Sequence, residues 1–307
     1  MELKLKGVKI ILGVGGIENS IDEKWSEMAA SQDKRKIFGN SLLKFLQKWN
    51  FDGVQIAWQY PVCNEAPCTR RNTSDKDSFS ILLVELSKIL RQHNLEFSAI
   101  VAPNPEVATI AYDPKVLMAT LDWIAIAAND YYETDSRRTA YLLPLKTNES
   151  QKTNSFLTIL RYWANIVPVS QLVMGVPAYG RTYTLRSELS TGIGAPISGS
   201  GTPGYYTQIP GFLAYYEICT QTESGAWEVR SSSEGTYAVS RSQWASYLRP
   251  QDMFAAATML RRVGLRGAAF WALDLDEWRG ACSCRPYGLL SALRQGLLEP
   301  NLQTLIC

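Results

Sequence analysis

The sequence predicts a parallel α/β fold, on two observations about the hydrophobic pattern of its 307 residues. Short apolar runs bounded by turn residues recur along the chain, and amphipathic stretches of helical period lie between them. Each run is apolar enough to be covered on both faces, as the strands of parallel sheets are. With 46% hydrophobic and 11% aromatic residues, the composition is that of a globular protein.

Six strands are predicted, in chain order at Val8–Val14, Val54–Trp58, Phe97–Ala102, Trp123–Ala128, Leu172–Val176 and Ala268–Leu273. Helices are predicted between them at Lys34–Trp49, Asp75–Gln92, Asn154–Ile166 and Asp252–Val263. Ser74 precedes the second helix and is a suitable N-cap for it. One large domain, with or without an insertion, fits this length.

The alternation breaks once, between Arg181 and Tyr247, where Gly, Ser, Thr, Pro and Tyr dominate and the sequence becomes turn-rich and strand-like. A disordered linker would have a similar composition of small residues. However, Phe212–Tyr216 and Trp227 make this segment unusually aromatic for a linker. The segment therefore indicates a small β-rich subdomain inserted between the fifth and sixth strands.

Charge and composition argue against several function classes. The 31 Lys and Arg against 29 Asp and Glu leave a net charge of +2 with no long basic run, so a nucleic acid partner is not expected. No stretch of about 18 apolar residues occurs that would span a membrane, and the first six residues lack the apolar core of a signal peptide. His93 is the only histidine and is expected on the surface, so neither a metal site of several histidines nor a cofactor is expected.

The six cysteines indicate the redox compartment. Cys63 and Cys68 bracket a short loop, Cys282 and Cys284 are two residues apart, and Cys219 and Cys307 stand alone. Because this spacing contains no Cys-x-x-Cys pair, loop-closing disulfides are a better interpretation than zinc or thiol redox chemistry. The even number, with possible glycosylation sequons at Asn72 and Asn148, favours an oxidising, secretory environment.

The segment from Phe51 to Pro61 is the most informative part of the chain. Alternate side chains of a strand share a face, so Gln55, Ala57 and Gln59 are predicted on one face. The apolar Val54, Ile56 and Trp58 are then on the other. In a closed barrel the apolar face would pack on the outer helices and the polar face would end at the rim where such barrels hold their sites. A half-exposed strand with two surface glutamines would show the same pattern.

This segment resembles the signature strand of glycoside hydrolase family 18, the chitinases and chitinase-like proteins, with its pattern Asp-Gly-x-Asp-x-Asp-x-Glu followed by Tyr-Pro. Other blocks resemble the family in the same order and extend the resemblance over essentially the whole chain. These blocks are Lys9–Gly16, Met174–Arg181, Phe212–Cys219 and Phe270–Asp276. Within the family, the chain most resembles an arthropod-type chitinase-like protein.

The resemblance implies a (β/α)8 barrel of the TIM type with an inserted α+β subdomain. The chain begins at what resembles the family's third strand, so the barrel is expected to be incomplete at its N-terminus and to leave strand edges uncovered. The implied organisation is barrel strands three to seven in residues 1–180, the inserted subdomain in 181–247, and the final strand with a C-terminal helix in 248–307.

The same resemblance argues against catalysis. In this family the N-acetyl oxygen of the sugar attacks, an Asp orients and stabilises it, and a Glu protonates the leaving oxygen. Those carboxylates are replaced here by Gln55, Ala57 and Gln59, so no catalytic residue is expected. Asp52 and Gly53 remain, in a structural role. Where the family has Met-x-Tyr-Asp, the chain has Ala127–Asp130, which replaces the tyrosine and keeps the aspartate.

Binding needs no acid, and the residues that would hold a sugar largely remain. Trp271 matches the tryptophan that floors the family's central subsite, and Tyr179, Arg181, Asp130 and Gln59 match other residues of the cleft. Buried packing is the alternative role for Trp271. Ile17 stands where the family often has tryptophan, which weakens one end of the cleft.

The expected function is therefore a non-hydrolytic protein that binds chitin or N-acetylglucosamine oligosaccharides, like the lectin and growth-factor members of the family. A signalling factor with a vestigial cleft and a protein receptor as its partner is one alternative, and a weakly active chitinase is another. The resemblance also implies secretion. It also implies a disulfide between Cys63 and Cys68 and another from Cys219 to Cys282 or Cys284, with Cys307 taking the remaining cysteine.

Overall fold

The computed structural model describes residues 2–21, 23–63, 72–130, 137–145, 155–283, 285–302 and 304–306. Its internal contacts divide the chain into two compact units. The first comprises Met1–Ala127 and Tyr162–Val173, and the second comprises Ala128–Arg161 and Met174–Cys307. None of the described helices is both long and apolar enough to cross a membrane.

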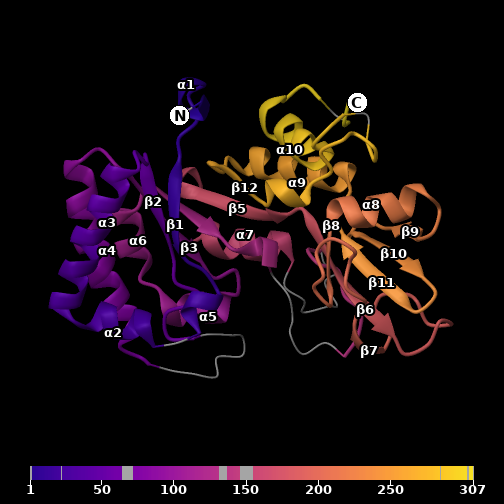
Figure 1. The fold of residues 1–307 in the computed structure, drawn as a ribbon, viewed down its shortest axis with the longest axis horizontal. Coiled ribbons are helices and arrows are strands. Elements are labelled where there is room, and N and C mark those ends of the chain that lie inside the picture. The colour runs from indigo at the N-terminus through magenta and orange to yellow at the C-terminus, as the bar shows by residue number, and fades with distance from the viewer. Residues whose placement is uncertain are drawn as a thin grey trace. The chain divides into compact units, whose positions relative to one another are not determined.

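The larger sheet has six strands in the hydrogen-bonded order β1-β2-β3-β4-β5-β12 (Figure 1). Their bounds are β1 Ile11–Gly15, β2 Gly53–Ala57, β3 Glu96–Val101, β4 Trp123–Ile126, β5 Leu172–Pro177 and β12 Gly267–Trp271. The pairs β1–β2, β2–β3 and β3–β4 are parallel. The structure thus confirms the six predicted strands and the predicted α/β class.

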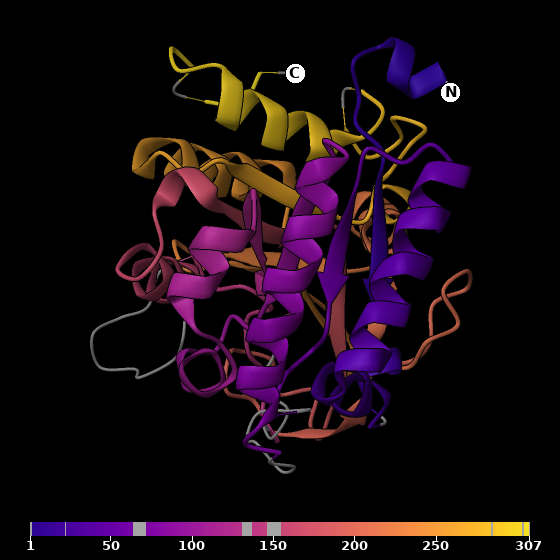
Figure 2. The same ribbon diagram turned by 90° about the vertical axis from the view of Figure 1, so that its left-hand side faces the viewer.

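The longer helices of the first unit lie in front of its strands in Figure 2, whereas α1 lies apart at the N-terminus. The helices of this unit are α1 Glu2–Leu5, α2 Lys24–Ala30, α3 Gln32–Lys48, α4 Asp75–Gln92, α5 Pro105–Ala111 and α6 Pro114–Thr120. On α4 the buried residues Phe79, Leu82, Leu86 and Leu90 recur every three or four positions. That spacing places them on one helix face, which explains why the sequence pattern predicted α4 correctly. His93 is exposed at the end of α4, as predicted.

The predicted side-chain cap of α4 is wrong. Ser74 occupies the N-cap position, but its hydroxyl makes no capping hydrogen bond to the helix. The Ser74 Oγ instead donates to the Asn72 Oδ1 at 2.7 Å. A local bond to a neighbouring side chain competes here with the helix terminus, as short polar side chains often allow.

The short helices α5 and α6 were not predicted. Each has seven residues, which is too short to show a clear helical period. Their start signals are nevertheless present, because Asn104 and Asp113 are N-caps followed directly by proline. The Asn104 Oδ1 accepts from the Glu106 N–H at 2.8 Å, and the Asp113 Oδ1 accepts from the Lys115 N–H at 2.9 Å.

The second unit contains an antiparallel sheet in the order β7-β6-β11-β10-β9, with β8 also paired to β6. Its strands are β6 Tyr179–Leu185, β7 Ile197–Ser200, β8 Phe212–Ala214, β9 Glu228–Ser231, β10 Thr236–Ser240 and β11 Gln243–Tyr247. A small core of its own stabilises this sheet, built on Tyr183, Leu185, Val239 and the fully buried Trp244. The sheet lies within the aromatic, turn-rich part of the sequence, where a β-rich subdomain is expected.

The second unit also contains helices, of which α9 and α10 pack side by side, as Figure 1 shows. They are α8 Tyr215–Glu223, α9 Pro250–Val263 and α10 Gly288–Leu298, with α7 Phe156–Ala164 shared between the units. The buried Asp276 carboxylate accepts from the Leu290 N–H at 3.0 Å and the Leu289 N–H at 3.3 Å. It therefore satisfies two of the free N–H groups at the start of α10.

Candidate functional site

Strand β2 separates its side chains as the sequence predicts. Val54, Ile56 and Trp58 are buried, whereas Gln55 is partly exposed. The Trp58 ring stacks on Trp25 of α2, with ring centroids 5.7 Å apart. It also meets Phe79 of α4 edge-on, again at 5.7 Å. The apolar face of β2 therefore packs against the helices. Gln55 and the buried Ala57 are on the opposite face, and Gln59 continues the alternation two residues beyond the end of the strand.

Backbone hydrogen bonds fix the end of β2. The Gly16 N–H donates to the Ala57 carbonyl oxygen at 2.8 Å. Next to it, the Ser20 hydroxyl donates to the Gly16 carbonyl at 2.8 Å and accepts from the Gln59 N–H at 3.0 Å. These bonds do not involve the side chain of residue 57 or 59. They hold the strand end whatever side chain stands there.

The two glutamines of this face differ in their contacts. The Gln55 Nε2 donates to the Ser98 Oγ of β3 over 3.4 Å, a long hydrogen bond. The Gln59 side-chain amide makes no hydrogen bond with any described residue. Neither amide titrates, so this face of β2 offers hydrogen-bond donors and acceptors and no acid.

Asp52 and Gly53 lie at the start of β2, at the other end of the strand from Gln59. The Asp52 carboxylate accepts from the Ile10 N–H at 2.7 Å and pairs with the Lys4 Nζ at 2.8 Å. The hydrogen bond from Lys4, with that from Ile10, lowers the pKa of Asp52. At Gly53 a Cβ atom would overlap the Glu96 carbonyl oxygen of β3, so only glycine allows this close approach of the strands.

In the second unit, β6 carries Tyr179 and Arg181 on one face. The Tyr179 hydroxyl donates to the Asn129 carbonyl oxygen at 2.6 Å. Its ring packs against Phe212 with centroids 4.8 Å apart, and the Arg181 guanidinium lies 5.7 Å from the centre of the same ring. The sequence analysis did not predict that Phe212 packs on Tyr179, although Phe212 begins one of the blocks that resemble the family.

Trp271 ends β12 with its side chain 57% exposed, so its ring is not a buried core aromatic. Its carbonyl oxygen accepts from the Ala178 N–H at 2.7 Å, and the Ala178 carbonyl accepts from the Tyr215 N–H at 3.0 Å. The second unit thus brings Trp271 into backbone contact with the residue that precedes Tyr179. The side chain of Asp130, the remaining predicted residue of this set, lies outside the described residues.

The disulfide that the structure describes joins Cys219 of α8 to Cys282, with Cα atoms 5.8 Å apart. This pairing is one of the two that the resemblance left open. Cys63 is also disulfide-bonded. Cys68, Cys284 and Cys307 lie outside the described residues.

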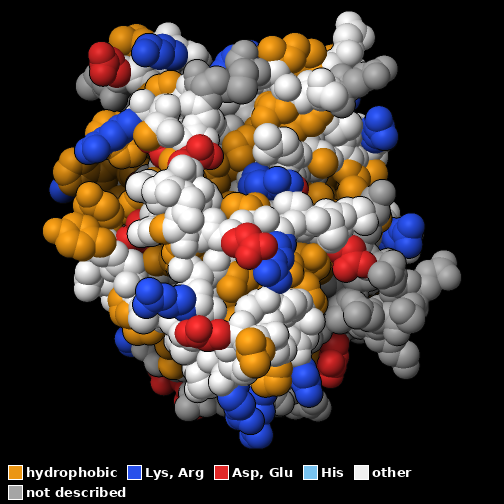
Figure 3. All heavy atoms as spheres, turned by 90° about the vertical axis from the view of Figure 1, so that its right-hand side faces the viewer, with side chains coloured by type: hydrophobic (Ala, Val, Ile, Leu, Met, Phe, Trp, Pro, Cys, Tyr) orange, Lys and Arg blue, Asp and Glu red, His pale blue; other side chains and the backbone are white. Residues whose placement is uncertain are grey.

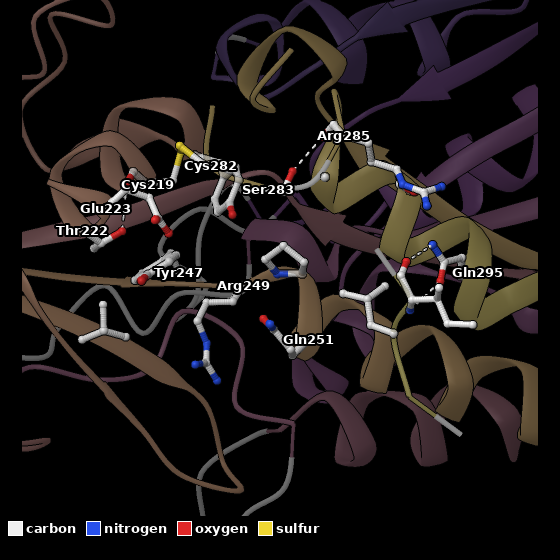
Figure 4. A pocket seen from close by; sticks show the side chains of 17 residues that line it. Cys219, Thr222, Glu223, Tyr247, Arg249, Gln251, Cys282, Ser283, Arg285 and Gln295 are labelled. Carbon is white, nitrogen blue, oxygen red and sulfur yellow. Dashed lines mark hydrogen bonds between the residues drawn. A yellow bond between two sulfur atoms is a disulfide. The ribbon is translucent and has the colours of Figure 1, made fainter. Parts of the chain in front are cut away.

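Sequence reasoning missed two cavities of the second unit. The smaller, of about 360 Å³, lies beside the Cys219–Cys282 bond (Figure 4). Along it, the Gln295 Nε2 donates to the Ile306 carbonyl at 2.9 Å and the Gln295 Oε1 accepts from the Ile306 N–H at 3.1 Å. The larger, of about 810 Å³, lies along the loop before β8. Within the described ranges, no cluster of three or more His, Cys, Asp or Glu residues is arranged to hold a metal ion.

Comparison with known proteins decides the family. The sequence profile of the glycosyl hydrolases family 18 matches residues 1–276. The chain belongs to this family. Probable chitinase 10 of Drosophila melanogaster is 34% identical over 305 residues, which cover 97% of this family 18 chain and 13% of the fly protein.

Solved structures agree with this assignment. A mutant of the Ostrinia furnacalis Group II chitinase catalytic domain 2, in complex with a chitin oligosaccharide, has a TM-score of 0.92 and 31% identity. That match covers 96% of this chain and 79% of the insect chain. Human YKL-39, a pseudo-chitinase with retained chitooligosaccharide binding, has a TM-score of 0.84 and 27% identity over 96% of this chain and 82% of its own.

These matches confirm the predicted (β/α)8 barrel fold, with a parallel barrel sheet and a small antiparallel sheet. The family 18 relatives include both chitinases and a pseudo-chitinase. The chain spans between 13% and 66% of the lengths of three curated relatives that it matches.

Proposed function

We propose that this family 18 chain is a non-hydrolytic chitinase-like protein that binds chitin or N-acetylglucosamine oligosaccharides. One observation carries the proposal: the three positions that hold the chemical carboxylates of the family are Gln55, Ala57 and Gln59. None of these side chains ionises. The chain therefore lacks both the acid that protonates the leaving oxygen and the charge that stabilises the intermediate.

The rate that is lost without these carboxylates is large enough to support a non-hydrolytic protein. General acid catalysis alone contributes roughly 10²–10⁴-fold to such reactions, and an amide cannot supply it at any pH because it has no titratable proton. The loss of the charge at position 57 adds to this, since electrostatic stabilisation is often the largest single contribution. Replacement of the family's tyrosine by Asn129 removes a further group that assists the N-acetyl oxygen.

Retained groups support binding. Trp271 presents an exposed ring of the kind that stacks on a sugar, and Tyr179, Arg181 and Asp130 match polar residues of the family's cleft. Tyr179 is buried and its hydroxyl donates to the Asn129 carbonyl, so it contributes by holding Asn129 in place. Gln59 has nearly the shape of the missing glutamate, and its Nε2 would donate a hydrogen bond to a glycosidic oxygen. The Cys219–Cys282 disulfide supports an extracellular location.

The test combines calorimetric titration of an N-acetylglucosamine tetramer with chromatography of the sugar after prolonged incubation. The wild-type protein is expected to bind saturably and to leave the tetramer intact. Trp271→Ala should weaken binding about tenfold or more, because it removes the ring that the sugar stacks on. Trp49→Ala is the matched control, since Trp49 is equally exposed at 58% but lies in the first unit after α3.

Two results would overturn the proposal. Cleavage that co-purifies with the protein at constant specific activity would show a chitinase. Absence of binding by a protein with a cooperative melting transition would instead favour a protein-interaction factor with a vestigial cleft, and Trp271→Ala would then leave its biological effect unchanged.

A further inference from the structure

The larger cavity of the second unit combines aromatic rings with polar groups. It measures about 810 Å³, within the range of about 300–1,000 Å³ that is usual for small-molecule sites. Most of the residues that line it come from the loop before β8, from α8, and from η4 (Leu273–Leu275) with the segment after it. Its aromatic residues are Tyr205, Tyr206, Tyr216, Trp227 and Trp278, and its acidic residues are Glu217, Asp274 and Glu277.

Three of these aromatic side chains are unusually exposed. Tyr205 is 83% exposed, Tyr206 70% and Trp278 54%. The two tyrosine rings pack edge-to-face with centroids 4.9 Å apart, and Tyr206 meets the Tyr216 ring in the same way at 5.8 Å. Contiguous exposed aromatic surface of this kind marks a binding site more often than it marks unused surface. Figure 3 shows one face of the molecule, on which acidic and basic side chains are dispersed among the hydrophobic ones.

The loop that carries the tyrosine pair is held in place by the nearly buried Glu217 carboxylate of α8. Glu217 Oε1 accepts from the Tyr206 N–H at 2.8 Å and the Thr207 N–H at 3.2 Å, and Oε2 accepts from the Thr207 hydroxyl at 2.8 Å. A Cβ atom at Gly204 would overlap the same carboxylate, so the loop approaches Glu217 as closely as the backbone allows. The exposed rings are therefore presented on a preformed loop, which lowers the entropy cost of binding.

Polar groups beside these rings are available to a ligand. The Asp274 carboxylate is exposed and makes no hydrogen bond or ion pair with the described residues. By contrast, the Glu277 carboxylate accepts from the Arg279 and Cys282 N–H groups and is already used. The Gln221 side chain is exposed at the cavity wall and makes no hydrogen bond with the described residues either.

We propose that this cavity is a second carbohydrate-binding site, for a short neutral oligosaccharide of pyranose rings. A pyranose ring has an apolar face of C–H groups and a rim of hydroxyl groups. The Arg279 guanidinium lies over the Trp278 ring, 4.7 Å from its centre. The C–H face of the sugar therefore fits the Tyr205 ring and the opposite face of Trp278, and its hydroxyl groups fit the Asp274 carboxylate, which has no partner among the described residues. Protein interfaces are also rich in tyrosine and tryptophan, but here the rings line a cavity with a few polar groups at its wall, which is the usual form of a small-molecule site.

The experiment separates this site from the one proposed around Trp271. An N-acetylglucosamine trimer and cellotriose are titrated into Trp271→Ala protein, and the indole N–H signals of Trp278 and Trp227 are followed by NMR. We expect both indole signals to shift saturably with at least one of the two sugars. Adding Tyr205→Ala and Trp278→Ala should weaken that binding about tenfold, read from the Trp227 signal.

Conservative variants keep the test independent of folding. Tyr205→Phe and Trp278→Phe retain a ring and should keep binding within about threefold of Trp271→Ala alone. Asp274→Asn should weaken binding about threefold to tenfold because it removes a charged acceptor. Glu188→Gln, which changes an exposed carboxylate of the same unit outside the cavity, should have no effect.

The proposal is overturned if neither sugar shifts the indole signals at millimolar concentration. It is equally overturned if binding persists unchanged after loss of both rings in a protein that melts cooperatively. Because every variant carries Trp271→Ala, either result leaves the function proposed for the Trp271 region untouched. Failure of that function would appear only in the comparison of wild-type protein with Trp271→Ala.

Discussion

The end of β2 in the first unit and the surroundings of Tyr179 in the second unit use their polar groups differently. At the end of β2 the hydrogen bonds join backbone to backbone or to Ser20, and the Gln59 amide has no partner among the described residues. Around Tyr179 the side chains bond and pack on one another, through the hydroxyl bond to Asn129 and the ring contact with Phe212. At the end of β2, hydrogen bonds of the backbone and of Ser20 fix the path of the main chain. Around Tyr179, contacts between side chains stabilise the structure.

The contrast shows that hydrogen bonds of the backbone can fix the geometry of a strand end independently of the side chains that the strand carries. The hydrogen bonds at the two ends of β2 do not involve the side chains at positions 55, 57 and 59. They are made by Gly16, Ser20 and Ala57 at one end and by Asp52 at the other. Replacing carboxylates there would cost little stability. The side-chain contacts of Tyr179, in contrast, depend directly on which residues are present, so substitutions there affect stability and binding together.

The largest predicted effect follows from restoring the carboxylates on β2. The triple variant Gln55→Asp, Ala57→Asp, Gln59→Glu is expected to hydrolyse a fluorogenic N-acetylglucosamine oligomer at least about 100-fold faster than the wild-type background. The reason is that a general acid contributes roughly 10²–10⁴-fold by itself. Initial rates with purified proteins measure the effect.

The matched control keeps the amide and restores the other two positions. Gln55→Asp with Ala57→Asp should remain at the wild-type background, because no group can protonate the leaving oxygen. The opposite result would be a triple variant that binds the oligomer but does not hydrolyse it. The backbone hydrogen bonds of β2 would then not be sufficient to place the three carboxylates for catalysis.

Much of β2 was predictable from sequence, because alternation along the strand needs no knowledge of distant parts of the chain. The pattern correctly assigned Val54, Ile56 and Trp58 to the buried face. In the second unit, the resemblance to the family could not decide between Cys282 and Cys284 as the partner of Cys219, since two positions so close in sequence fit a disulfide equally well.

The sequence does not predict which distant segments come together to form the larger cavity. The larger cavity depends on the loop around Tyr205 meeting the segment around Asp274, about seventy residues further along the chain, and no periodicity links them. The signal that could have drawn attention to it is the pair Tyr205 and Tyr206, together with Trp278, in polar sequence that should not bury aromatic rings.

A smaller effect is expected at Tyr179. Tyr179→Phe removes the hydroxyl that donates to the Asn129 carbonyl and keeps the ring on Phe212. We expect a loss of about 1 kcal/mol in the free energy of unfolding, the usual value for one hydrogen bond, and weaker binding of the N-acetylglucosamine tetramer. Urea unfolding and calorimetry measure the two changes.

Tyr162→Phe is the control for Tyr179→Phe, because the Tyr162 hydroxyl also makes one bond, to the Thr109 Oγ1 at 2.9 Å, in an exposed part of the first unit. It should lose less stability and leave tetramer binding unchanged. If Tyr179→Phe behaves like this control, the side-chain interactions around Tyr179 matter no more than an ordinary surface contact.

The smallest predicted effect is on the free energy of unfolding, comes from Asp52 at the start of β2, and depends on pH. The hydrogen bonds from Lys4 and Ile10 lower the pKa of Asp52 in the folded protein below the value of about 3.9 that an unfolded chain would show. The stabilisation by Asp52 is therefore fully present above about pH 4 and is lost as the pH falls through its folded pKa. Asp52→Asn should cost less than about 1 kcal/mol at neutral pH, because the ion pair is partly exposed.

Urea unfolding of wild-type protein and Asp52→Asn at several pH values between neutral and about pH 3 isolates this effect, because the other carboxylates titrate in both proteins and cancel in the difference. The difference in unfolding free energy should stay constant above about pH 5 and shrink below about pH 4. A difference that stays constant throughout would mean that the carboxylate charge does not anchor the start of β2. The Ile10 N–H bond, which an asparagine Oδ1 can also accept, would then hold the start of β2 by itself.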